Sequence, residues 1–528
     1  MNYFLYKRSI FVTAIIILFS VSAIVAEILP RADTYTSPHK YALVQRGGSV
    51  IVQDESGMSS NSTLDSTASF ELSTSNDSND IDVTMEKKGL KVLFLSADTG
   101  GGHRASAESL AKQFLKYFPG TDYDLVDVWT PTGVYPYRTL VPSYKHLSAH
   151  PRRWKALYYI SNTRIYEQMT NIHSTLTCKE KIRKHLESYD PDVVISVHPT
   201  MTYLPEKIVR QIGEKRGKKI PFFTVVTDFG SGHCTWFQGM VDRMYVASDR
   251  IKTLAKRRGA KLSDDDLVMS GLPIRDEFAI HAKNMNGRTT EHGKNYRRDM
   301  KASIGLDPEK KMILLMGGGE GVGSLGEIAE NLYYELRRKG VDASICVVCG
   351  RNEQLREDIK TKNWDKMYEE RKERRSKSGS LKKLKNILKR KSPNMKEISS
   401  GTRDGDVTVL GLGFVSNMAD FMVAADVLVS KAGPGTIAEA ASLGLPVMIT
   451  SFLPGQEAGN VDIVLDGGFG AFQKNPIKIA SILSDWLTND SLIDEMSKKS
   501  EAAGNPNAAA DIVKDIGKIT LEIMNEKS

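Results

Sequence analysis

The stretch VLVSKAGPGTIAEAASLGLPVMITSFLPGQEAGN, from Val427 to Asn460, decides the fold of this chain. Its first residues form a short apolar run of the kind found in buried strands. A turn without large side chains follows, and an alanine-rich helix then runs from Thr436 to Ser442, where a glycine and a proline end it. The pattern predicts an α/β unit whose loop presents bare backbone N–H groups at a helix N-terminus, an arrangement that favours phosphate.

Polar side chains accompany this loop and favour a nucleotide sugar as its ligand. Glu439 lies one turn into the helix, where its carboxylate can accept hydrogen bonds from two hydroxyls of a ribose. Gln456, Glu457 and Asn460 belong to the second loop and can face a sugar. Gly455, at the start of this loop, is a predicted donor-site residue as well. The alternative is that the glycines only serve the packing of one more βαβ unit. The predicted donor-site residues of the first loop are Ala432, Gly433, Pro434, Gly435 and Thr436.

Further motifs recur along the chain, at Leu93–Leu110, Ile195–Pro205, Phe222–Phe237, Gly271–Phe278 and Leu314–Gly323. Together with the first stretch they resemble the monogalactosyldiacylglycerol synthases, relatives of the lipid-II-forming N-acetylglucosaminyltransferase. The resemblance extends from about Lys91 to Trp486. It implies an α/β protein of the GT-B type, with two Rossmann-like domains facing each other across a cleft. It also implies an inverting transfer of galactose from UDP-galactose to the free hydroxyl of diacylglycerol.

A histidine at the start of a helix is the candidate base. His103 follows a glycine turn that lacks the lysine of a P-loop. A helix N-terminus disfavours the imidazolium ion, so we expect His103 to be neutral and able to accept a proton. A capping or surface histidine is the alternative. The resemblance implies that His103 is the base that deprotonates the acceptor hydroxyl.

Other segments supply candidate contacts to UDP. The resemblance implies that the backbone at Gly413, Phe414 and Val415 reads the uracil ring, and Arg275 is expected to meet the diphosphate, with a surface arginine as the alternative. A second glycine loop includes the pattern G-x-G-x-x-G, which keeps a dehydrogenase as an alternative until the sugar-type loop is considered. The remaining predicted donor residues are Gly102, Gly318, Gly319, Glu320 and Gly350.

Aromatic and basic side chains alternate between Asp127 and Tyr159, as is typical of a membrane interface. An ordinary long loop packed on the domain is the alternative. The resemblance implies that the lipid acceptor binds here: Pro136 matches a proline tied to lipid binding. Trp129, Tyr137 and Trp154 are the further lipid-site candidates.

Three residues near strand ends, His198, Asp228 and His233, lack the spacing of a metal site. We interpret them as cleft lining, although the segment TDFGSGHCTWF around His233 departs from the family pattern. No metal and no cofactor are therefore expected, with UDP-galactose as the co-substrate.

Composition divides the chain into segments. Residues 1–26 are predicted to be a signal peptide or membrane anchor, 27–88 a disordered polar linker, and 89–290 the acceptor domain. Residues 301–490 are predicted to be the UDP-sugar domain with a basic insertion at 364–403, and 491–528 a helical tail. The polar segment 284–300 is expected to link the domains. Cys346 and Cys349 are expected to be packed thiols rather than a redox pair.

The net charge of +8 is local. Residues 366–396 hold 13 Lys and Arg against 3 Glu, a net charge of +10, so the rest of the chain carries about −2. No nucleic-acid partner is therefore expected. We expect the insertion to loop out of the sheet, either as a basic amphipathic helix on anionic membrane lipids or as a disordered charged loop. Its apolar stripe is Leu381, Leu384, Ile387 and Leu388.

A signal followed by a polar tract suits a plastid that is reached through the secretory route. We expect a membrane-associated protein of the plastid envelope, with the endoplasmic reticulum membrane as the alternative. Two other functions remain open from the residues. One is a related lipid glycosyltransferase that uses UDP-glucose or UDP-N-acetylglucosamine. The other is a non-catalytic protein that binds lipid or nucleotide.

Overall fold

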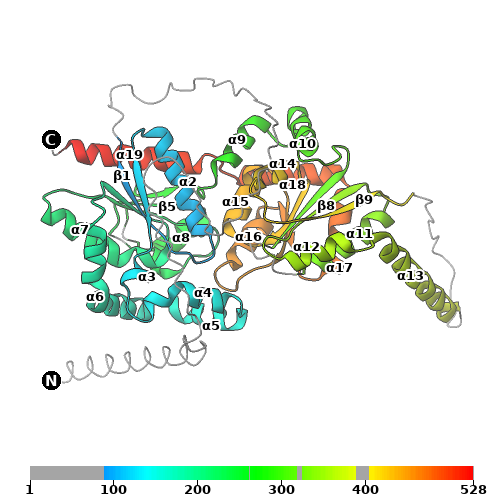
Figure 1. Cartoon of the computed structure of the whole chain (residues 1–528), viewed down its shortest axis with the longest axis horizontal. Helices are drawn as coiled ribbons and strands as arrows, with labels where there is room; N and C mark the ends of the chain where they lie inside the picture. The colour runs from blue at the N-terminus through cyan, green and yellow to red at the C-terminus, as the bar shows by residue number, and fades with distance from the viewer. Residues whose placement is uncertain (1–88, 239, 261, 318–323, 388–402, 527–528) are drawn as a thin grey trace, which may run out of the picture.

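The structure, a computed structural model, describes residues 89–526 apart from 239, 261, 318–323 and 388–402. Two parallel six-stranded sheets lie side by side, each covered by helices on both faces (Figure 1). This is the two-domain GT-B arrangement that the motifs predict. The predicted signal or anchor and the polar linker lie outside the described residues, and so does the glycine loop 318–323.

The first sheet has the strand order β2-β1-β3-β4-β5-β6. Its four interior strands are short apolar runs buried on both faces, as expected for a parallel sheet covered by helices, whereas its two edge strands are partly exposed. The strands are β1 (Lys91–Leu95), β2 (Asp122–Val126), β3 (Val193–Ser196), β4 (Phe222–Val225), β5 (Arg243–Val246) and β6 (Leu267–Met269).

The second sheet has the order β12-β11-β10-β7-β8-β9. Its strands are β7 (Lys311–Met316), β8 (Ala343–Val348), β9 (Val407–Leu412), β10 (Val427–Lys431), β11 (Val447–Ser451) and β12 (Gly470–Phe472). The strand predicted to begin the decisive stretch is β10, and it lies beside β7 in the interior of the sheet. Cys346 and Cys349 are buried free thiols, as predicted.

The strand order reverses between β1 and β3 in the first sheet and between β7 and β10 in the second. Open parallel sheets bind ligands beyond the carboxyl ends of the strands at such a reversal. His103 follows β1 and His198 follows β3, whereas the loop at Gly433 follows β10. The chain therefore brings its candidate base and its candidate phosphate loop to the two reversal points.

Helices of the first domain precede the second sheet in the chain. They are α2 (Gly102–Tyr117), α3 (Trp129–Thr132), η2 (Tyr137–Thr139), α4 (Leu140–Ser148), α5 (Pro151–Ser161), α6 (Arg164–Glu187), η3 (Pro199–Met201), α7 (Tyr203–Lys215), η4 (Cys234–Trp236) and α8 (Asp249–Arg258). The segment around Pro136 is therefore mostly helical, and α3, α4 and α5 pack against one another or against α6.

Helices of the second part surround the second sheet, except for the last one. They are α9 (Asp276–Met285), α10 (Glu291–Ser303), α11 (Leu325–Arg338), α12 (Glu353–Thr361), α13 (Trp364–Ile387), α14 (Met418–Ala424), α15 (Pro434–Ser442), α16 (Ala458–Asp466), α17 (Pro476–Leu487), α18 (Asp490–Ala503) and α19 (Ala508–Asn525).

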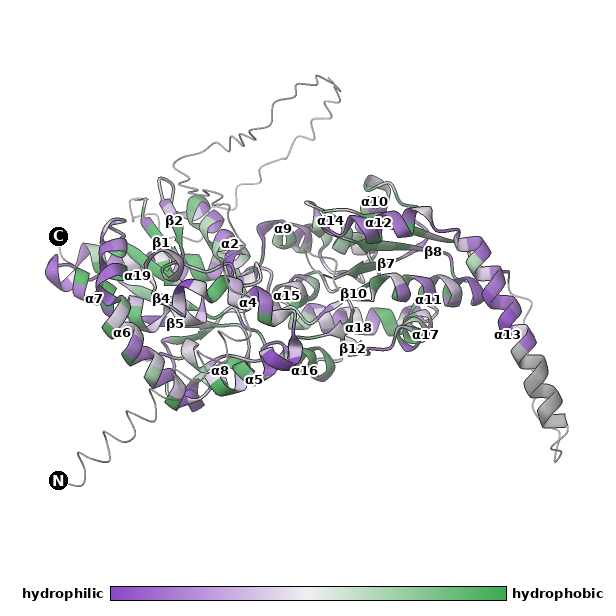
Figure 2. Cartoon of the chain, turned by 60° about the horizontal axis from the view of Figure 1, so that its bottom comes forward, coloured by the Kyte–Doolittle hydropathy of each residue, from purple (hydrophilic) through white to green (hydrophobic). Residues whose placement is uncertain are grey.

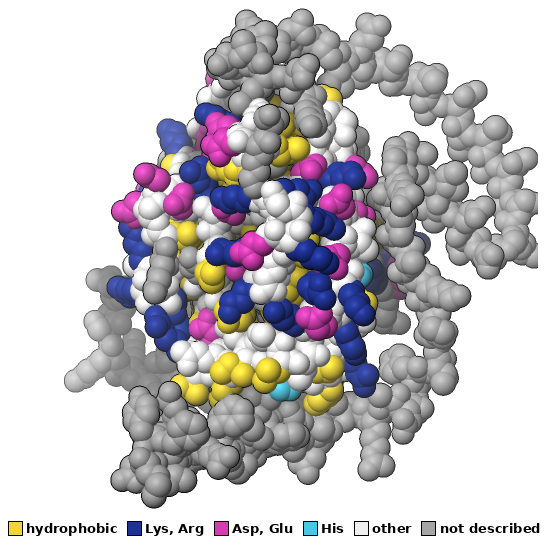
Figure 3. Space-filling model, turned by 90° about the vertical axis from the view of Figure 1, so that its left-hand side faces the viewer, with side chains coloured by type: hydrophobic (Ala, Val, Ile, Leu, Met, Phe, Trp, Pro, Cys, Tyr) yellow, Lys and Arg dark blue, Asp and Glu magenta, His cyan; other side chains and the backbone are white. Residues whose placement is uncertain are grey.

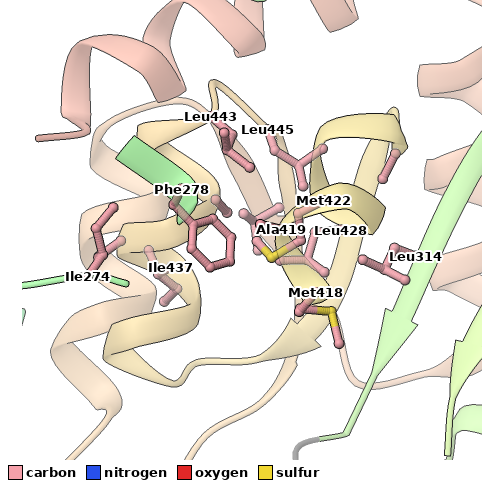
Figure 4. Close-up of a cluster of buried hydrophobic side chains, with 14 of the residues drawn as sticks. Ile274, Phe278, Leu314, Met418, Ala419, Met422, Leu428, Ile437, Leu443 and Leu445 are labelled. Carbon is pink, nitrogen blue, oxygen red and sulfur yellow. The ribbon is translucent and has the colours of Figure 1, made fainter. Parts of the chain in front are cut away.

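The core of the second domain includes residues that precede its first strand. Ile274 and Phe278 pack among side chains of α14 and α15, including Ile437 and Met422 (Figure 4). The segment 284–300, expected to be a polar linker, is instead largely helix α10. Its Arg297 and the neighbouring Lys301 form ion pairs with Asp426, which is buried. Pairing of these charges explains why a polar sequence packs inside a domain.

The last helix returns to the first domain. α19 packs against α2, and the C-terminus lies on the side of the first sheet (Figure 1). Ile512, Val513 and Ile516 are buried in the same apolar cluster as Phe94 of β1. Asp515 accepts hydrogen bonds from Arg243 at 2.9 and 2.8 Å and from Tyr245 at 2.7 Å. The first domain is therefore completed by the end of the chain.

The basic insertion does not simply loop out of the sheet. Its first part forms α13, a largely hydrophilic helix that projects from the second domain (Figure 2). Tyr368 of this helix is only 1% exposed, packs with Tyr334 of α11, and donates a hydrogen bond to Asp404 at 2.9 Å. The start of the insertion thus belongs to the core, because aromatic residues among its lysines anchor it. The apolar stripe beyond residue 377 lies outside the described side chains.

Candidate active site

His103 lies at the first turn of α2, directly beyond the carboxyl end of β1. The chain turns into this helix through Gly101, whose φ of 78° is in the left-handed region that glycine adopts readily. The His103 side chain is buried, and its Nδ1 lies 2.6 Å from the hydroxyl oxygen of Thr227, at the end of β4. The helix start therefore places the imidazole in the cleft with one of its two nitrogens already engaged.

Burial keeps His103 neutral. Desolvation lowers the pKa of the imidazole to about 4, and the nearby carbonyl of Val197 only partly opposes this effect. The neutral state expected from the sequence agrees with this effect of burial. A neutral imidazole at physiological pH can accept a proton.

His198, at the end of β3, stands beside His103 with its ring centroid 4.7 Å away. Both of its nitrogens are engaged: Nδ1 accepts from the backbone N–H of Thr200 at 3.3 Å, and Nε2 lies 2.9 Å from the hydroxyl of Thr99. Burial and the neighbouring His103 hold the pKa of His198 well below its usual value. His198 therefore packs against the candidate base and has no nitrogen left for a substrate.

An apolar cavity of about 300 Å³ opens beside these two histidines. All four predicted lipid residues line it: Trp129, Pro136, Tyr137 and Trp154. Trp129 and Tyr137 stack with ring centroids 4.8 Å apart, and Trp154 contacts Tyr144 edge to face. The cavity thus joins the candidate base to the aromatic segment that follows β2.

Few charged side chains line this cavity. Among the described residues that line it there is no lysine or arginine, and Asp228 is the one carboxylic acid. Asp228 accepts a hydrogen bond from the indole N–H of Trp236 at 2.7 Å. Burial raises the pKa of Asp228 to about 7, although the hydrogen bonds from Trp236 and the His233 backbone oppose this. The pocket therefore suits a neutral ligand with a long apolar part.

Asp228, His198 and His233 all line the cavity, as predicted for cleft residues. His233 contacts the hydroxyls of Ser161 and Thr235. Within the part of the chain that the structure describes, no group of three or more His, Cys, Asp or Glu is arranged to hold a metal ion.

The candidate donor residues gather at the carboxyl edge of the second sheet. Gly350 follows β8, Gly413, Phe414 and Val415 follow β9, and the loop from Ala432 to Thr436 follows β10. Pro434 is the first residue of α15 and Gly433 is its N-cap, so the helix N-terminus points its free N–H groups at this edge. Phe414 is 74% exposed. Gly318, Gly319 and Glu320 lie outside the described residues, and Gly102 lies across the cleft at the start of α2.

Arg275 and Glu439 contact each other instead of lying free. Arg275 Nε donates to Glu439 Oε1 at 2.9 Å, and the Arg275 guanidinium also lies over the ring of Phe278. Glu439 belongs to α15, the helix that follows the Gly433 loop, and its ion pair brings Arg275 to that helix. Their charges are paired with each other, so a ribose or a diphosphate has to compete with this ion pair.

The second loop, which follows β11, carries two polar side chains that bind other protein groups and one whose oxygen has no partner in the described structure. Glu457 is engaged by Lys431 at 3.0 Å and by the backbone N–H of Leu453 at 2.7 Å. Asn460 is 1% exposed and hydrogen-bonded at both ends of its amide. The expectation that these two face a sugar is therefore corrected, since protein groups already satisfy them. Gln456 differs: its buried Oε1 has no partner in the described structure, and the residue lines the lipid-type cavity.

The two domains touch through glycines that sequence reasoning missed. Gly230 donates its N–H to the Asn460 side chain at 2.8 Å, and Gly459 donates to the Ser231 hydroxyl at 2.8 Å. The Asn460 amide also donates to the carbonyl of Ala432 in the phosphate-type loop, at 2.8 Å. We refer to Gly230, Ser231, Gly459 and Asn460 as the glycine clasp. It connects the acceptor cleft to the donor loop.

Gly455 makes a second contact between the domains. A Cβ at this position would lie 2.4 Å from the ring of Tyr158, on α5. Gly455 was predicted only as a donor-site residue. Thr227, Tyr144 and Tyr158 are site residues that sequence reasoning did not single out, although Thr227 stands next to the strand-end residue Asp228.

Comparisons with known proteins agree with this geometry. Residues 103–274 match the family model described as "Monogalactosyldiacylglycerol (MGDG) synthase", and residues 312–512 match "Glycosyltransferase family 28 C-terminal domain". A probable chloroplastic monogalactosyldiacylglycerol synthase of Glycine max is 33% identical over 442 residues, which cover 83% of this chain and 72% of that protein.

Monogalactosyldiacylglycerol synthase 1 of Arabidopsis thaliana is 32% identical over 432 residues, covering 81% of this chain and 70% of that protein. Among solved structures, MurG of Acinetobacter baumannii aligns over 81% of this chain and 99% of its own, with 15% identity and a TM-score of 0.48. The sequence relatives match both halves of the chain at once. The chain therefore belongs to the monogalactosyldiacylglycerol synthase family.

Proposed function

We propose that this protein is a galactosyltransferase that makes monogalactosyldiacylglycerol, by transferring galactose from UDP-galactose to the free hydroxyl of 1,2-diacylglycerol. The observation that carries this proposal is the apolar cavity with a neutral, buried histidine at its inner wall. Diacylglycerol is an uncharged lipid whose polar part is a hydroxyl next to two esters. A cavity lined by aromatic rings, with no lysine or arginine among its described lining residues, fits such a molecule.

The reaction needs a base that takes the hydroxyl proton and a positively polarised group that stabilises the negative charge of the departing diphosphate. His103 takes the hydroxyl proton, and the freed oxygen attacks the anomeric carbon of the sugar from the side opposite UDP. The bond between that carbon and the diphosphate oxygen breaks in the same step, so an α-linked donor gives a β-galactoside and UDP. The N-terminus of α15 meets the charge of the departing diphosphate.

No metal enters this scheme. The helix N-terminus and Arg275, once released from Glu439, supply the positive charge that a divalent ion supplies in other transferases. Gln456 belongs to the donor domain and reaches the acceptor cavity, so it marks where sugar and lipid come together. These assignments make the cleft between the domains the reaction site.

A face of the first domain supports membrane binding. Helices α5 and α6, which also line the cavity, expose Ile160, Ile165, Ile172 and Leu176, of which Ile165 and Leu176 are 74% and 76% exposed. The last three share one side of α6, being seven and four residues apart. Apolar side chains gather along the lower edge of this face in Figure 3, at the height of α6 in Figure 1. We call these four residues the apolar ridge.

Helix α5, which carries Ile160 of the ridge, also exposes three cations: Arg152, Arg153 and Lys155. Apolar side chains beside cations suit the surface of a bilayer that holds anionic lipids. No helix in the described residues is both long and apolar enough to cross a bilayer. We therefore propose that the first domain lies on the membrane by this face and draws diacylglycerol from it.

The location proposed for the protein is the plastid envelope. The relatives from Glycine max and Arabidopsis thaliana are named chloroplastic, which supports a plastid. The secretory-type signal and the alternative location in the endoplasmic reticulum concern residues 1–88, outside the described structure.

The deciding experiment incubates purified protein with dispersed diacylglycerol and, separately, UDP-galactose, UDP-glucose and UDP-N-acetylglucosamine. Monogalactosyldiacylglycerol with the β configuration is expected from UDP-galactose alone, also in the presence of a chelator. Another sugar product would identify a related lipid glycosyltransferase, and absence of any product with UDP still bound would identify a binding protein. His103→Ala should lower turnover by roughly 10²–10⁴-fold without changing UDP affinity.

A further inference from the structure

A threonine at the end of β4 contacts the candidate base directly. Thr227 is 4% exposed, and its Oγ1 lies 2.6 Å from Nδ1 of His103, a short distance for a hydrogen bond between uncharged groups. Because Nδ1 faces Thr227, Nε2 is the ring nitrogen that remains for a substrate. Whether Nε2 can accept a proton depends on which nitrogen carries the hydrogen of the neutral ring.

The surroundings of Thr227 favour a hydrogen on Nδ1. The carbonyl of Val197 lies 3.5 Å from the Thr227 hydroxyl oxygen and also interacts with the His103 ring. A carbonyl only accepts, and the Thr227 hydroxyl is a donor that faces it. When the hydroxyl donates to Val197, the lone pair of Thr227 is left to receive the Nδ1–H.

His198 does not determine which nitrogen of His103 carries the ring hydrogen. Its Nδ1 accepts from the Thr200 backbone, so its own ring hydrogen is on Nε2, and this hydrogen points to the Thr99 hydroxyl at 2.9 Å. His198 therefore has no hydrogen to give to His103. Its ring packs edge-on to His103 at 4.7 Å and limits rotation of the imidazole. The position of the hydrogen on His103 is left to Thr227 and Val197.

We infer that Thr227 is a positioning residue, whose hydroxyl holds the Nδ1–H form of His103 and so leaves Nε2 with the lone pair that deprotonates the acceptor lipid. The inference rests on the proposed role of His103 as the base. In the step, Nε2 gains the proton of the lipid hydroxyl, and the Nδ1–H bond to Thr227 is kept in the imidazolium ion that forms. Without the hydroxyl, the hydrogen can move to Nε2, and this form of the ring cannot accept a proton from the substrate.

Thr227→Val tests this, because valine has the shape of threonine without the hydroxyl. We expect kcat to fall roughly 10- to 100-fold, as for loss of a group that orients a catalytic histidine, while KM for both substrates stays within about twofold. Thr227→Ser restores the hydroxyl and should lose no more than about threefold. Thr224→Val is the matched control: Thr224 is buried on β4, three residues before Thr227, and its hydroxyl has no partner among the described residues.

Thr227→Val should also have no effect once His103 is alanine, because both changes then remove the same function. Equal losses from Thr227→Val in the two backgrounds would overturn the inference, as would wild-type kcat in the single variant. If Thr227→Val does not fold, Thr227→Ala against Thr227→Ser gives the same comparison. A normal kcat for His103→Ala alone would instead refute the proposed function of His103, so the two failures are distinct.

Discussion

Replacing Gly230 by alanine should push the two domains apart at the glycine clasp. A Cβ on Gly230 would lie 2.1 Å from the carbonyl carbon and oxygen of Gly459, whereas ordinary contacts begin at about 3.4 Å. The backbones must therefore separate by about 1.3 Å. The hydrogen bond from Gly230 to Asn460, now 2.8 Å, would then exceed 3.5 Å, and so would the bond from Gly459 to Ser231.

The cost can be worked from these contacts. Each buried hydrogen bond contributes about 0.5–1.5 kcal/mol, and overpacking adds about 1–3 kcal/mol. Loss of both hydrogen bonds and the overpacking together should thus destabilise the contact between the domains by about 2–6 kcal/mol. Since the clasp joins the acceptor cleft to the donor loop, this loss should appear in catalysis, as a decrease in kcat/KM of roughly 30-fold or more.

Two measurements separate this effect from unfolding. Steady-state kinetics on detergent-dispersed diacylglycerol should show the loss, whereas UDP affinity and the thermal midpoint should change little, because each domain keeps its own core. Gly326→Ala is the control: its added Cβ meets only a methyl of Leu355 at 3.4 Å. A Gly230→Ala protein with the kcat/KM of the wild type would refute the idea that the clasp closes the active form.

Three further outcomes are expected. His103 must be neutral to accept a proton, and burial lowers its pKa to about 4, so kcat/KM should fall at acidic pH with a midpoint near pH 4. A midpoint near pH 6.5 would mean that water reaches the imidazole in the free enzyme. Burial raises the pKa of Asp228 in the folded protein to about 7, so the contribution of Asp228 to stability is present below about pH 4 and is lost as the pH rises through 7. Asp228→Asn should therefore raise the thermal midpoint at pH 8 but not at pH 4. Equal shifts at both pH values would contradict this. Deleting residues 378–396 should leave the fold and the activity in detergent intact. Deleting residues 366–396 should instead destabilise the protein, because it removes the buried Tyr368 from the core. Thermal unfolding of the two variants, followed by circular dichroism, tests this difference.

Much of the architecture could be predicted from local patterns. Short apolar runs identify buried strands such as β1 and β10, and glycine turns after them identify strand ends. Since strand ends of a parallel sheet meet at one edge, the position of His103 and of the Gly433 loop followed from the sequence. The aromatic residues at 129–154 line one cavity with His103, and their contact with a lipid stays a prediction.

Contacts between distant segments could not be predicted. Arg275 and Glu439 each carry a charge suited to a ligand, but only the folded chain shows that they pair with each other. Asn460 is polar in sequence, and its burial depends on Gly230, 230 positions earlier. Thr227 looks like any strand-end threonine until His103 is placed beside it. Periodicity reports which side of an element is buried, and it does not report which element covers that side.

The return of α19 to the first domain affects the order in which the protein can fold during synthesis. Domains usually form in the order in which they leave the ribosome, with the N-terminal one first. Here Ile512, Val513 and Ile516 complete the apolar cluster around β1, and they are made after the whole second domain. The first domain therefore waits, with part of its core uncovered, while the second domain has all of its strands and can fold. A chaperone that binds exposed apolar surface should consequently find its target in the half of the chain that was made first.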